Sequence, residues 1–240
     1  MQVTLISHTP DAEALLIFTK GARLGLSPAR LEEIRLLAPE RRAAELAYMA
    51  ETIPSSWEFV DYVFCVEGVS RAYTHQQVRT RTGSYAQQSL RVVNKSEFDY
   101  VFPDRPMPGA CRHILESTLG VIKNTYQTLV ERGVSVEDAR GILPTNIATN
   151  IVCKFNLRTM SELAASRTGG RTQSEYQAVV SAMCDEVLRV HPWAAQFLFP
   201  RERNYFDDIE AFAERVFGGD LVRKGELLKI VDKMRKEREA

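Results

Sequence analysis

The chain has 240 residues, 45% of them hydrophobic and 26% charged, which is enough to build the core of one large domain or two small ones. Its 31 basic residues balance 31 acidic ones, which argues against a general nucleic-acid binder with a basic excess or stripe. There is no apolar run of membrane-spanning length, and the first residues lack the pattern of a secretion signal. We therefore expect a cytoplasmic protein that binds neither a membrane nor a nucleic acid polymer.

The first third of the chain is predicted to contain both strands and helices. The segment that follows Thr9-Pro10 is expected to be helical through about Leu24, because proline suits a first helical turn. Polar and apolar residues alternate in the aromatic-rich segment Trp57–Val66, which predicts a long strand. The other elements expected here are a strand at Gln2–Ser7 and helices at Leu31–Met49 and Glu67–Arg79.

The rest of the chain is predicted to form helices and one further strand. A long amphipathic helix at Met107–Arg132 is ended by Gly133, and Ala148–Phe155 favours a strand. The helices expected besides these are Ser135–Arg140, Leu157–Ser166, Thr172–Val190 and a charged helix at Leu221–Ala240. The pattern predicts an α+β fold, in which a central, mostly antiparallel sheet is flanked by long helices. We expect one domain over residues 1–220, followed by the charged helix over 221–240.

The polar segment Arg79–Arg91 is the most distinctive part of the chain. It holds three arginines and two glutamines but almost no aliphatic bulk, so it does not build a core. Guanidinium forks and amides bind phosphate and planar heterocycles. The alternative is a surface loop whose arginines pair with nearby carboxylates. We predict a loop that leads into a strand at Leu90–Val93.

Metal and disulfide chemistry are not expected. The four cysteines lie far apart with no Cys-x-x-Cys pair, and the four histidines show no metal-ligand spacing. Buried free thiols are the expected state of Cys65, Cys111, Cys153 and Cys184.

The polar segment and its surroundings resemble the flavin-dependent thymidylate synthases. The family signature is His-Gln-x-x, then Arg-His-Arg, two residues and Ser, and a polar run that ends in Ser-x-Arg. It is matched at His75, Gln76, Arg79, Arg81, Ser84, Tyr85, Gln87, Gln88, Ser89 and Arg91. Other family-like pieces follow in the family's order and cover about residues 1–200. These pieces are Val3–Pro10, Ala139–Pro144, Asn156-x-Arg158, Ser166-Arg167 and Gln173-x-Glu175.

The resemblance implies a homotetramer with shared active sites that converts dUMP to dTMP. It further implies FAD as cofactor, methylenetetrahydrofolate as carbon donor and NADPH as reductant. Arg167 would be catalytic, because it would stabilise negative charge on the uracil ring. The substrate-binding residues implied are Gln76, Arg79, Gln87, Gln88, Ser89, Leu90, Arg91, Arg140 and Arg167. Those implied for FAD are Ser55, Arg79, Thr80, Arg81, Gln87, Asn156, Arg158 and Glu162.

Several positions depart from the family pattern. Thr80 replaces the central histidine of the signature, and Ile53 and Phe59 stand where the family has histidines. Glu162 and Arg171 replace amide or histidine positions, and we expect them to form a local ion pair. A second hypothesis is therefore a divergent homologue with a weakened or altered FAD site, which binds or modifies another pyrimidine nucleotide such as dCMP. A third is a structural oligomer with an arginine-rich interface.

Overall fold

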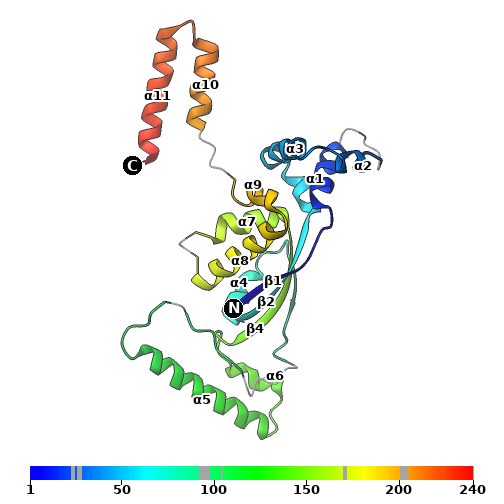
Figure 1. Ribbon diagram of the computed structural model, residues 1–240. Helices are drawn as coiled ribbons and strands as arrows, with labels where there is room; N and C mark the ends of the chain where they lie inside the picture. The colour runs from blue at the N-terminus through cyan, green and yellow to red at the C-terminus, as the bar shows by residue number, and fades with distance from the viewer. Residues whose placement is uncertain are drawn as a thin grey trace. The chain divides into compact units, whose positions relative to one another are not determined.

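The computed structural model describes residues 1–22, 25, 29–91, 98–103, 105–169, 172–200 and 205–239. Two compact units divide the chain, Met1–Pro200 and Arg201–Ala240 (Figure 1). The elements in chain order are β1 (Gln2–His8), α1 (Ala12–Ala22), α2 (Ala29–Arg35), α3 (Pro39–Thr52), the 3₁₀ helix η1 (Pro54–Phe59), β2 (Asp61–Ser70), α4 (Arg71–Gln77), β3 (Ser84–Gln87), α5 (Cys111–Glu131), α6 (Val136–Ala139), η2 (Arg140–Ile142), β4 (Ala148–Asn156), α7 (Leu157–Arg167), α8 (Ser174–Val190), η3 (Pro192–Ala194), α9 (Ala195–Leu198), α10 (Tyr205–Phe217) and α11 (Leu221–Glu239).

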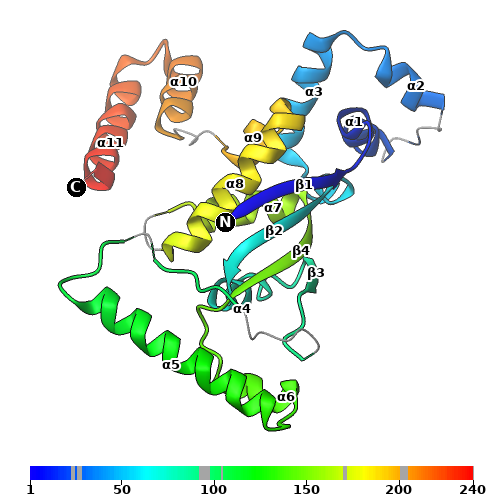
Figure 2. The ribbon, with the colours of Figure 1, turned by 60° about the horizontal axis from the view of Figure 1, so that its bottom comes forward.

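A four-stranded antiparallel sheet with strand order β1-β2-β4-β3 forms the centre of the first unit (Figure 2). Its register pairs Tyr62 with Phe155 and Phe64 with Cys153, so that their side chains share one buried face. Helix α8 packs on β1 and β2, and α7 packs on β4. The expected α+β fold, with an antiparallel sheet between helices, is confirmed.

Two helices begin directly where a strand ends. β2 passes into α4 at Ser70, whose hydroxyl accepts a hydrogen bond from the Tyr73 amide at 3.0 Å. β4 passes into α7 at Asn156, whose side chain accepts one from the Thr159 amide at 2.9 Å. These side chains satisfy amides that a helix N-terminus leaves unpaired, so each strand end fixes the start of its helix.

Helix α5 packs over a small core of its own. Phe98, Tyr126, Ala139 and Ile147 are buried together. Ile114 and Val121 on the same helix are exposed, at 62% and 65%. The expected helix at Met107–Arg132 is therefore present as α5, with part of its apolar surface open.

Three expected elements have different bounds. The helix predicted at Leu31–Met49 is split into α2 and α3, because Pro39 has no amide hydrogen and stands at the first position of α3. The strand predicted at Trp57–Val66 begins only at Asp61, since Trp57 lies in η1 and donates from its indole to the Met49 carbonyl at 3.1 Å. The strand then continues to Ser70, so the helix predicted at Glu67–Arg79 shrinks to α4.

The polar segment was expected to be a loop, but the structure shows otherwise. It contains the short strand β3, which pairs with β4 from Ser84↔Lys154 to Gln87↔Ile151. Leu90 is not in a strand, and residues 92 and 93 of the strand predicted at Leu90–Val93 lie outside the described residues.

The second unit is a helical hairpin of α10 and α11. The expected charged helix is present as α11, whereas α10 was not anticipated. The boundary expected at residue 220 falls between these two contacting helices. In the described parts of the chain, no helix is both long enough and apolar enough to span a bilayer.

Candidate nucleotide site

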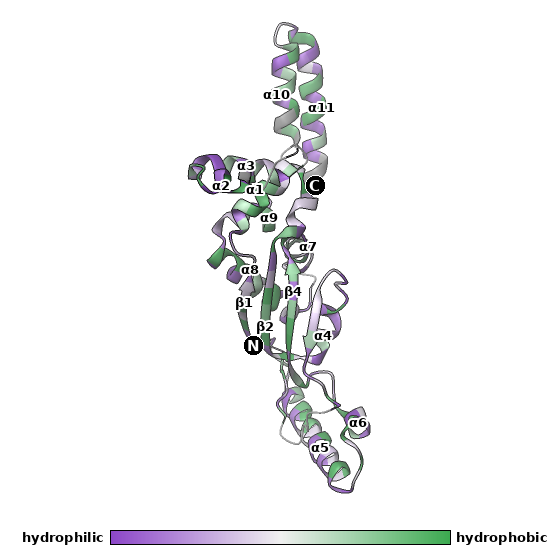
Figure 3. Ribbon diagram, turned by 90° about the vertical axis from the view of Figure 1, so that its right-hand side faces the viewer, coloured by the Kyte–Doolittle hydropathy of each residue, from purple (hydrophilic) through white to green (hydrophobic). Residues whose placement is uncertain are grey.

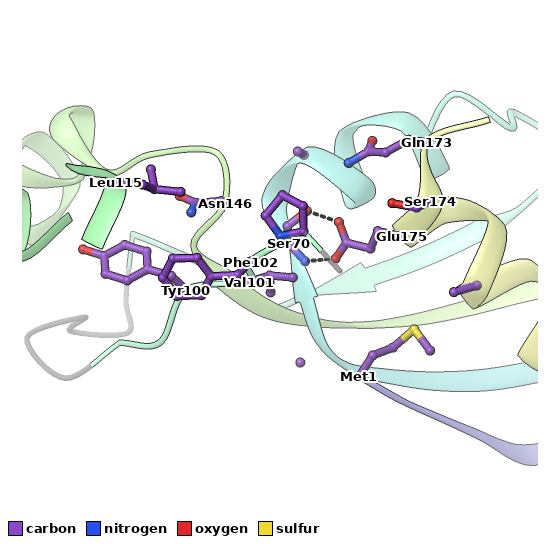
Figure 4. A pocket seen from close by; sticks show the side chains of 14 residues that line it. Met1, Ser70, Tyr100, Val101, Phe102, Leu115, Asn146, Gln173, Ser174 and Glu175 are labelled. Carbon is purple, nitrogen blue, oxygen red and sulfur yellow. Dashed lines mark hydrogen bonds between the residues drawn. The ribbon is translucent and has the colours of Figure 1, made fainter. Parts of the chain in front are cut away.

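Helix α4 is tied to the N-terminal turn of α8. The Glu175 carboxylate accepts hydrogen bonds from the Ser70 amide at 2.6 Å and the Ser70 hydroxyl at 2.5 Å, as Figure 4 shows. At the other end of α4, the Gln76 amide donates to the Gln173 side chain. The Gln173-x-Glu175 motif thus holds α4, from which Gln76 projects and after which Arg79 follows.

A cavity of about 770 Å³ opens beside this contact (Figure 4). Its walls combine aromatic rings of the segment after Phe98 with polar groups at the start of α8. None of the residues predicted as site residues lines it. The lining residues are Met1, Gly68, Ser70, Ala72, Tyr100, Val101, Phe102, Pro103, Leu115, Asn146, Gln173, Ser174, Glu175 and Ala178.

The start of the polar segment is a tight turn built around Tyr85. Its hydroxyl donates to the carbonyls of Gln77 at 3.0 Å and Thr80 at 2.6 Å, and its ring lies edge-on against Phe155. A Cβ on Gly83 would lie 2.5 Å from the Phe155 ring, so only glycine fits there. The turn fixes the backbone at Thr80 and leaves Arg79 and Arg81 on either side of it.

Arg79 and Arg81 are exposed, and no carboxylate in the described part of the chain pairs with them. Two of the expected flavin residues therefore hold free positive charge. This arrangement favours an anionic ligand over the alternative of a salt-bridged surface loop.

A second pair of guanidinium groups meets near the end of the polar segment. Burial and, to a smaller degree, the nearby charge of Arg140 lower the pKa of Arg71. Arg71 donates to the Gln88 carbonyl at 3.3 Å, and no described carboxylate pairs with either arginine. Two like charges without a counter-ion favour a bound anion such as phosphate.

Arg91 lies close to this pair through its own ion pair. It contacts Glu137 at 2.8 Å, three residues before Arg140, and both side chains are about half exposed. An exposed pair of this kind contributes little stability, so an incoming phosphate could replace the carboxylate. The Ser89 hydroxyl accepts from the Arg91 amide at 3.1 Å, which closes the turn.

Arg167, at the end of α7, has a buried Nε with no hydrogen-bond partner among the described residues. Its guanidinium lies 5.1 Å above the Tyr176 ring, and the Tyr176 ring lies edge-on to Tyr73. The Tyr176 hydroxyl and the Gln77 amide nitrogen are also buried without described partners. Buried polar groups are nearly always paired, so these atoms point to a ligand that completes them.

The expected flavin residues near α7 already have protein partners. Arg158 pairs with Glu58 at 2.8 Å and with Glu162 at 3.3 Å, while Asn156 caps the helix. The proposed partner of Glu162, Arg171, lies outside the described residues. Ser55 lies exposed in η1.

The predicted substrate residues therefore fall into separate groups in one chain. Gln76 and Arg79 follow from α4, whereas Gln88, Arg91 and Arg140 gather near Arg71. The Gln87 amide donates to the Thr74 hydroxyl at 2.7 Å, and Leu90 is half-buried. Arg71, Gln77 and Tyr176 were not among the predicted site residues, although each stands within a few residues of a family-like motif.

The four cysteines differ in burial. Burial raises the pKa of Cys153 and of Cys184 to about 12, so neither is a ready nucleophile. Cys65 is half-buried and Cys111 exposed, contrary to the expected burial of all four. Across the described residues, no three metal-ligating side chains gather at one point.

Comparison with known proteins gives the family. The model of the thymidylate synthase complementing protein family matches residues 4–193. A flavin-dependent thymidylate synthase of Geobacter sulfurreducens is 34% identical over 200 residues, which cover 80% of this chain and 84% of that protein. The enzyme of the same name from Sulfolobus acidocaldarius is 36% identical over 202 residues, with coverage of 83% and 77%. The chain belongs to the thymidylate synthase complementing protein family, and the expected resemblance is confirmed.

Proposed function

We propose that this protein is an FAD-dependent methyltransferase, a thymidylate synthase that converts dUMP to dTMP. Methylenetetrahydrofolate is the carbon donor, NADPH is the reductant, and the enzyme is a cytoplasmic homotetramer. Beside the family match, the observation that carries the proposal is the set of guanidinium groups without carboxylate partners. Such groups suit a substrate with a phosphate dianion and a base that becomes anionic.

The phosphate of dUMP is bound by Arg91 and Arg140, with Arg71 beside them. The planar fork of arginine donates two hydrogen bonds to a phosphate and stays charged at all relevant pH values. The remaining substrate contacts come from Gln76, Arg79, Gln87, Gln88, Ser89 and Leu90.

Arg167 acts on the uracil ring. C5 of uracil accepts carbon more readily when N3 has lost its proton, and a fixed cation favours that anion. The effect is strongest where water is excluded, as at the buried Nε of Arg167. The centre of the Tyr176 ring lies 5.1 Å from the guanidinium carbon, and the ring packs against it.

When bound and reduced by NADPH, the flavin would supply the hydride for the reduction that completes the methyl group. The free guanidinium groups of Arg79 and Arg81 suit its pyrophosphate, and the fixed turn at Thr80 presents them together. Asn156, Arg158 and Glu162 at the start of α7, together with Ser55 and Gln87, complete the proposed cofactor contacts. Because Arg158 pairs with Glu58 and Glu162, its contact with FAD requires exchange of those exposed ion pairs.

Absorbance spectroscopy and a coupled assay test the proposal. Purified protein with added FAD should show flavin absorbance after gel filtration, and dUMP should stimulate NADPH oxidation and dTMP formation when methylenetetrahydrofolate is present. A protein that stays colourless with added FAD and forms no dTMP would refute it.

A further inference from the structure

The hairpin of α10 and α11 lies beyond the part of the chain that matches the family. The family model ends at residue 193, and the hairpin forms a separate compact unit over Arg201–Ala240. Its role therefore does not follow from the proposed activity.

Within this unit, very little apolar surface is buried. Of the described hairpin residues, only Ala213 on α10 and Val231 on α11 are fully buried. Two helices of this size with so small a core do not hold together in water, and domains of about 40 residues generally need a partner or a cross-link. A further surface must therefore cover the hairpin.

The hairpin presents one apolar face, formed by Phe212 and Val216 on α10 and by Ile230 and Met234 on α11. These side chains are 46%, 50%, 57% and 51% exposed. Figure 3 shows apolar residues along both helices.

Helix geometry places the four residues on the same side. Phe212 precedes the buried Ala213, and Ile230 precedes the buried Val231, so each is turned about 100° from the contact between the helices. Because α10 and α11 are antiparallel, these two rotations carry Phe212 and Ile230 to the same side of the plane that contains both helix axes. Val216 and Met234 follow one turn later and extend the face.

Charge complementarity indicates what covers this face. Helix α10 contains four acidic residues and one basic residue, whereas α11 contains seven basic and four acidic residues. Glu210 already pairs with Arg235 and Glu214 with Lys224 across the hairpin. Consider a second copy related to the first by a two-fold axis parallel to the helices. The acidic α10 of the second copy then lies against the basic α11 of the first, and the apolar faces of the two hairpins meet.

We propose that the α10–α11 hairpin is a self-association module, which forms a four-helix bundle with the hairpin of a second copy of this chain. The arrangement makes every neighbouring helix pair antiparallel and oppositely charged. The face formed by Phe212, Val216, Ile230 and Met234 becomes the core of that bundle.

Cysteine cross-linking of the full chain tests which surface meets a second copy. In a Cys111→Ser background, Ile230→Cys treated with a bismaleimide should give covalent dimers on a denaturing gel. Val222→Cys, whose site is 72% exposed but lies away from the face, is the matched control and should stay monomeric on the gel. Equal dimer yields from both variants, or none from Ile230→Cys, would overturn the proposal.

Hydrogen exchange supplies a second readout that does not depend on the oligomeric state of the rest of the protein. Phe212→Glu with Ile230→Glu should abolish amide protection in α10 and α11. Ala211→Glu with Val222→Glu adds the same charge on the other side and should leave protection in place. Protection that survives the first pair of substitutions contradicts self-association. If the hairpin of the unmodified protein becomes protected only on adding phosphatidylserine vesicles, a membrane surface is its partner and the proposal fails.

Discussion

A buried arginine nitrogen without a partner is costly, because the charged group has lost water and gained no acceptor. The Nε of Arg167 is in that position, and its guanidinium lies over the Tyr176 ring. A ligand that accepts a hydrogen bond from this nitrogen offsets the cost of desolvation, and an acceptor that becomes anionic forms the strongest hydrogen bond.

Replacing Arg167 by alanine should lower kcat for dTMP formation by about 100- to 1000-fold, the usual loss when one stabiliser of a developing anion is removed. The KM for dUMP should change much less, because Arg91 and Arg140 still bind the phosphate. Steady-state kinetics on the FAD-loaded protein measure both constants.

Arg189→Ala is the control, since Arg189 is an exposed arginine that pairs only with Glu186 among the described residues. This variant should keep full activity. If Arg167→Ala raises KM and leaves kcat intact, Arg167 binds substrate without acting on the ring.

His191 is a buried histidine held in its neutral form. Its Nδ1 lies 3.0 Å from the Tyr62 hydroxyl, and the His8 ring centroid is 4.8 Å away. Burial, with a smaller effect from His8, lowers the pKa of His191 to about 4. In the unfolded chain histidine has a pKa of about 6.5, so between about pH 4 and 6.5 His191 is protonated in the unfolded chain and neutral in the folded protein.

The free energy of unfolding should therefore decrease as the pH falls from about 6.5 to 4, by roughly 3 kcal/mol from this residue. Well above pH 6.5 His191 does not lower the stability of the folded protein, because it is neutral in both the folded and the unfolded state. His191→Gln retains a hydrogen-bond acceptor for Tyr62 but does not titrate, so its urea midpoint should fall less between pH 7.5 and pH 4.5. His113→Gln, at an exposed histidine, should behave like the unmodified protein; equal pH dependence in all three would exclude this explanation.

The candidate site residues could be named from the sequence, but which of them pair with a carboxylate could not. The family-like motifs named Arg79, Arg140 and Arg167, because chain order and spacing are visible in a sequence. Whether a guanidinium faces a carboxylate depends on contacts between distant residues, such as Arg91 with Glu137. Arg71 was overlooked for the same reason: only the fold brings it beside Arg140.

The connection between α4 and α8 determines where Gln76 and Arg79 stand. One carboxylate, Glu175, receives both the backbone amide and the hydroxyl of Ser70, which is the cap of α4. Hydrogen bonds to a charged acceptor are among the stronger ones in proteins.

Glu175→Gln removes the charge and one acceptor while preserving shape. We expect the free energy of unfolding to fall by about 1.5–3 kcal/mol. We also expect the KM for dUMP to rise, because α4 is less firmly held. Urea unfolding and steady-state kinetics measure the two effects. Asp185→Asn, at an exposed site on the same helix, should change neither; an unaltered KM in Glu175→Gln would mean that the contact serves stability alone.

Elements with strong periodicity were predicted well, and those fixed by long-range pairing were not. α5, β4, α7 and α8 follow from local patterns. β3 was missed because its residues Ser84–Gln87 are mostly polar, and only pairing with β4 makes them a strand. The start of β2 was misplaced because the aromatic residues of η1 imitate strand alternation while Trp57 packs into the core.

The candidate site residues form separate groups within one chain, which fits the proposed homotetramer with shared active sites. Arg167 lies over the Tyr176 ring, which packs edge-on against Tyr73, whereas Arg140 lies near Arg71, which donates to Gln88. If each active site takes Arg167 from one copy and Arg140 from another, two inactive variants should rescue each other.

Arg167→Ala and Arg140→Ala proteins, unfolded together and refolded as a mixture, should regain about a quarter of normal activity, since random pairing restores that share of sites. Each variant refolded alone should remain inactive. Assay of dTMP formation after mixing without unfolding is the control for subunit exchange. No gain in the refolded mixture would place both arginines in the same copy.

The two junctions at Ser70 and Asn156, where a strand becomes a helix with no residue between, have a consequence for how the chain can change. One inserted residue would turn the following helix by about 100° and advance it by about 1.5 Å. Gln76 and Arg167 would then leave their sites although every side chain was retained. Natural length variation among relatives should therefore avoid these two points and accumulate elsewhere, for example in the connection that precedes α5.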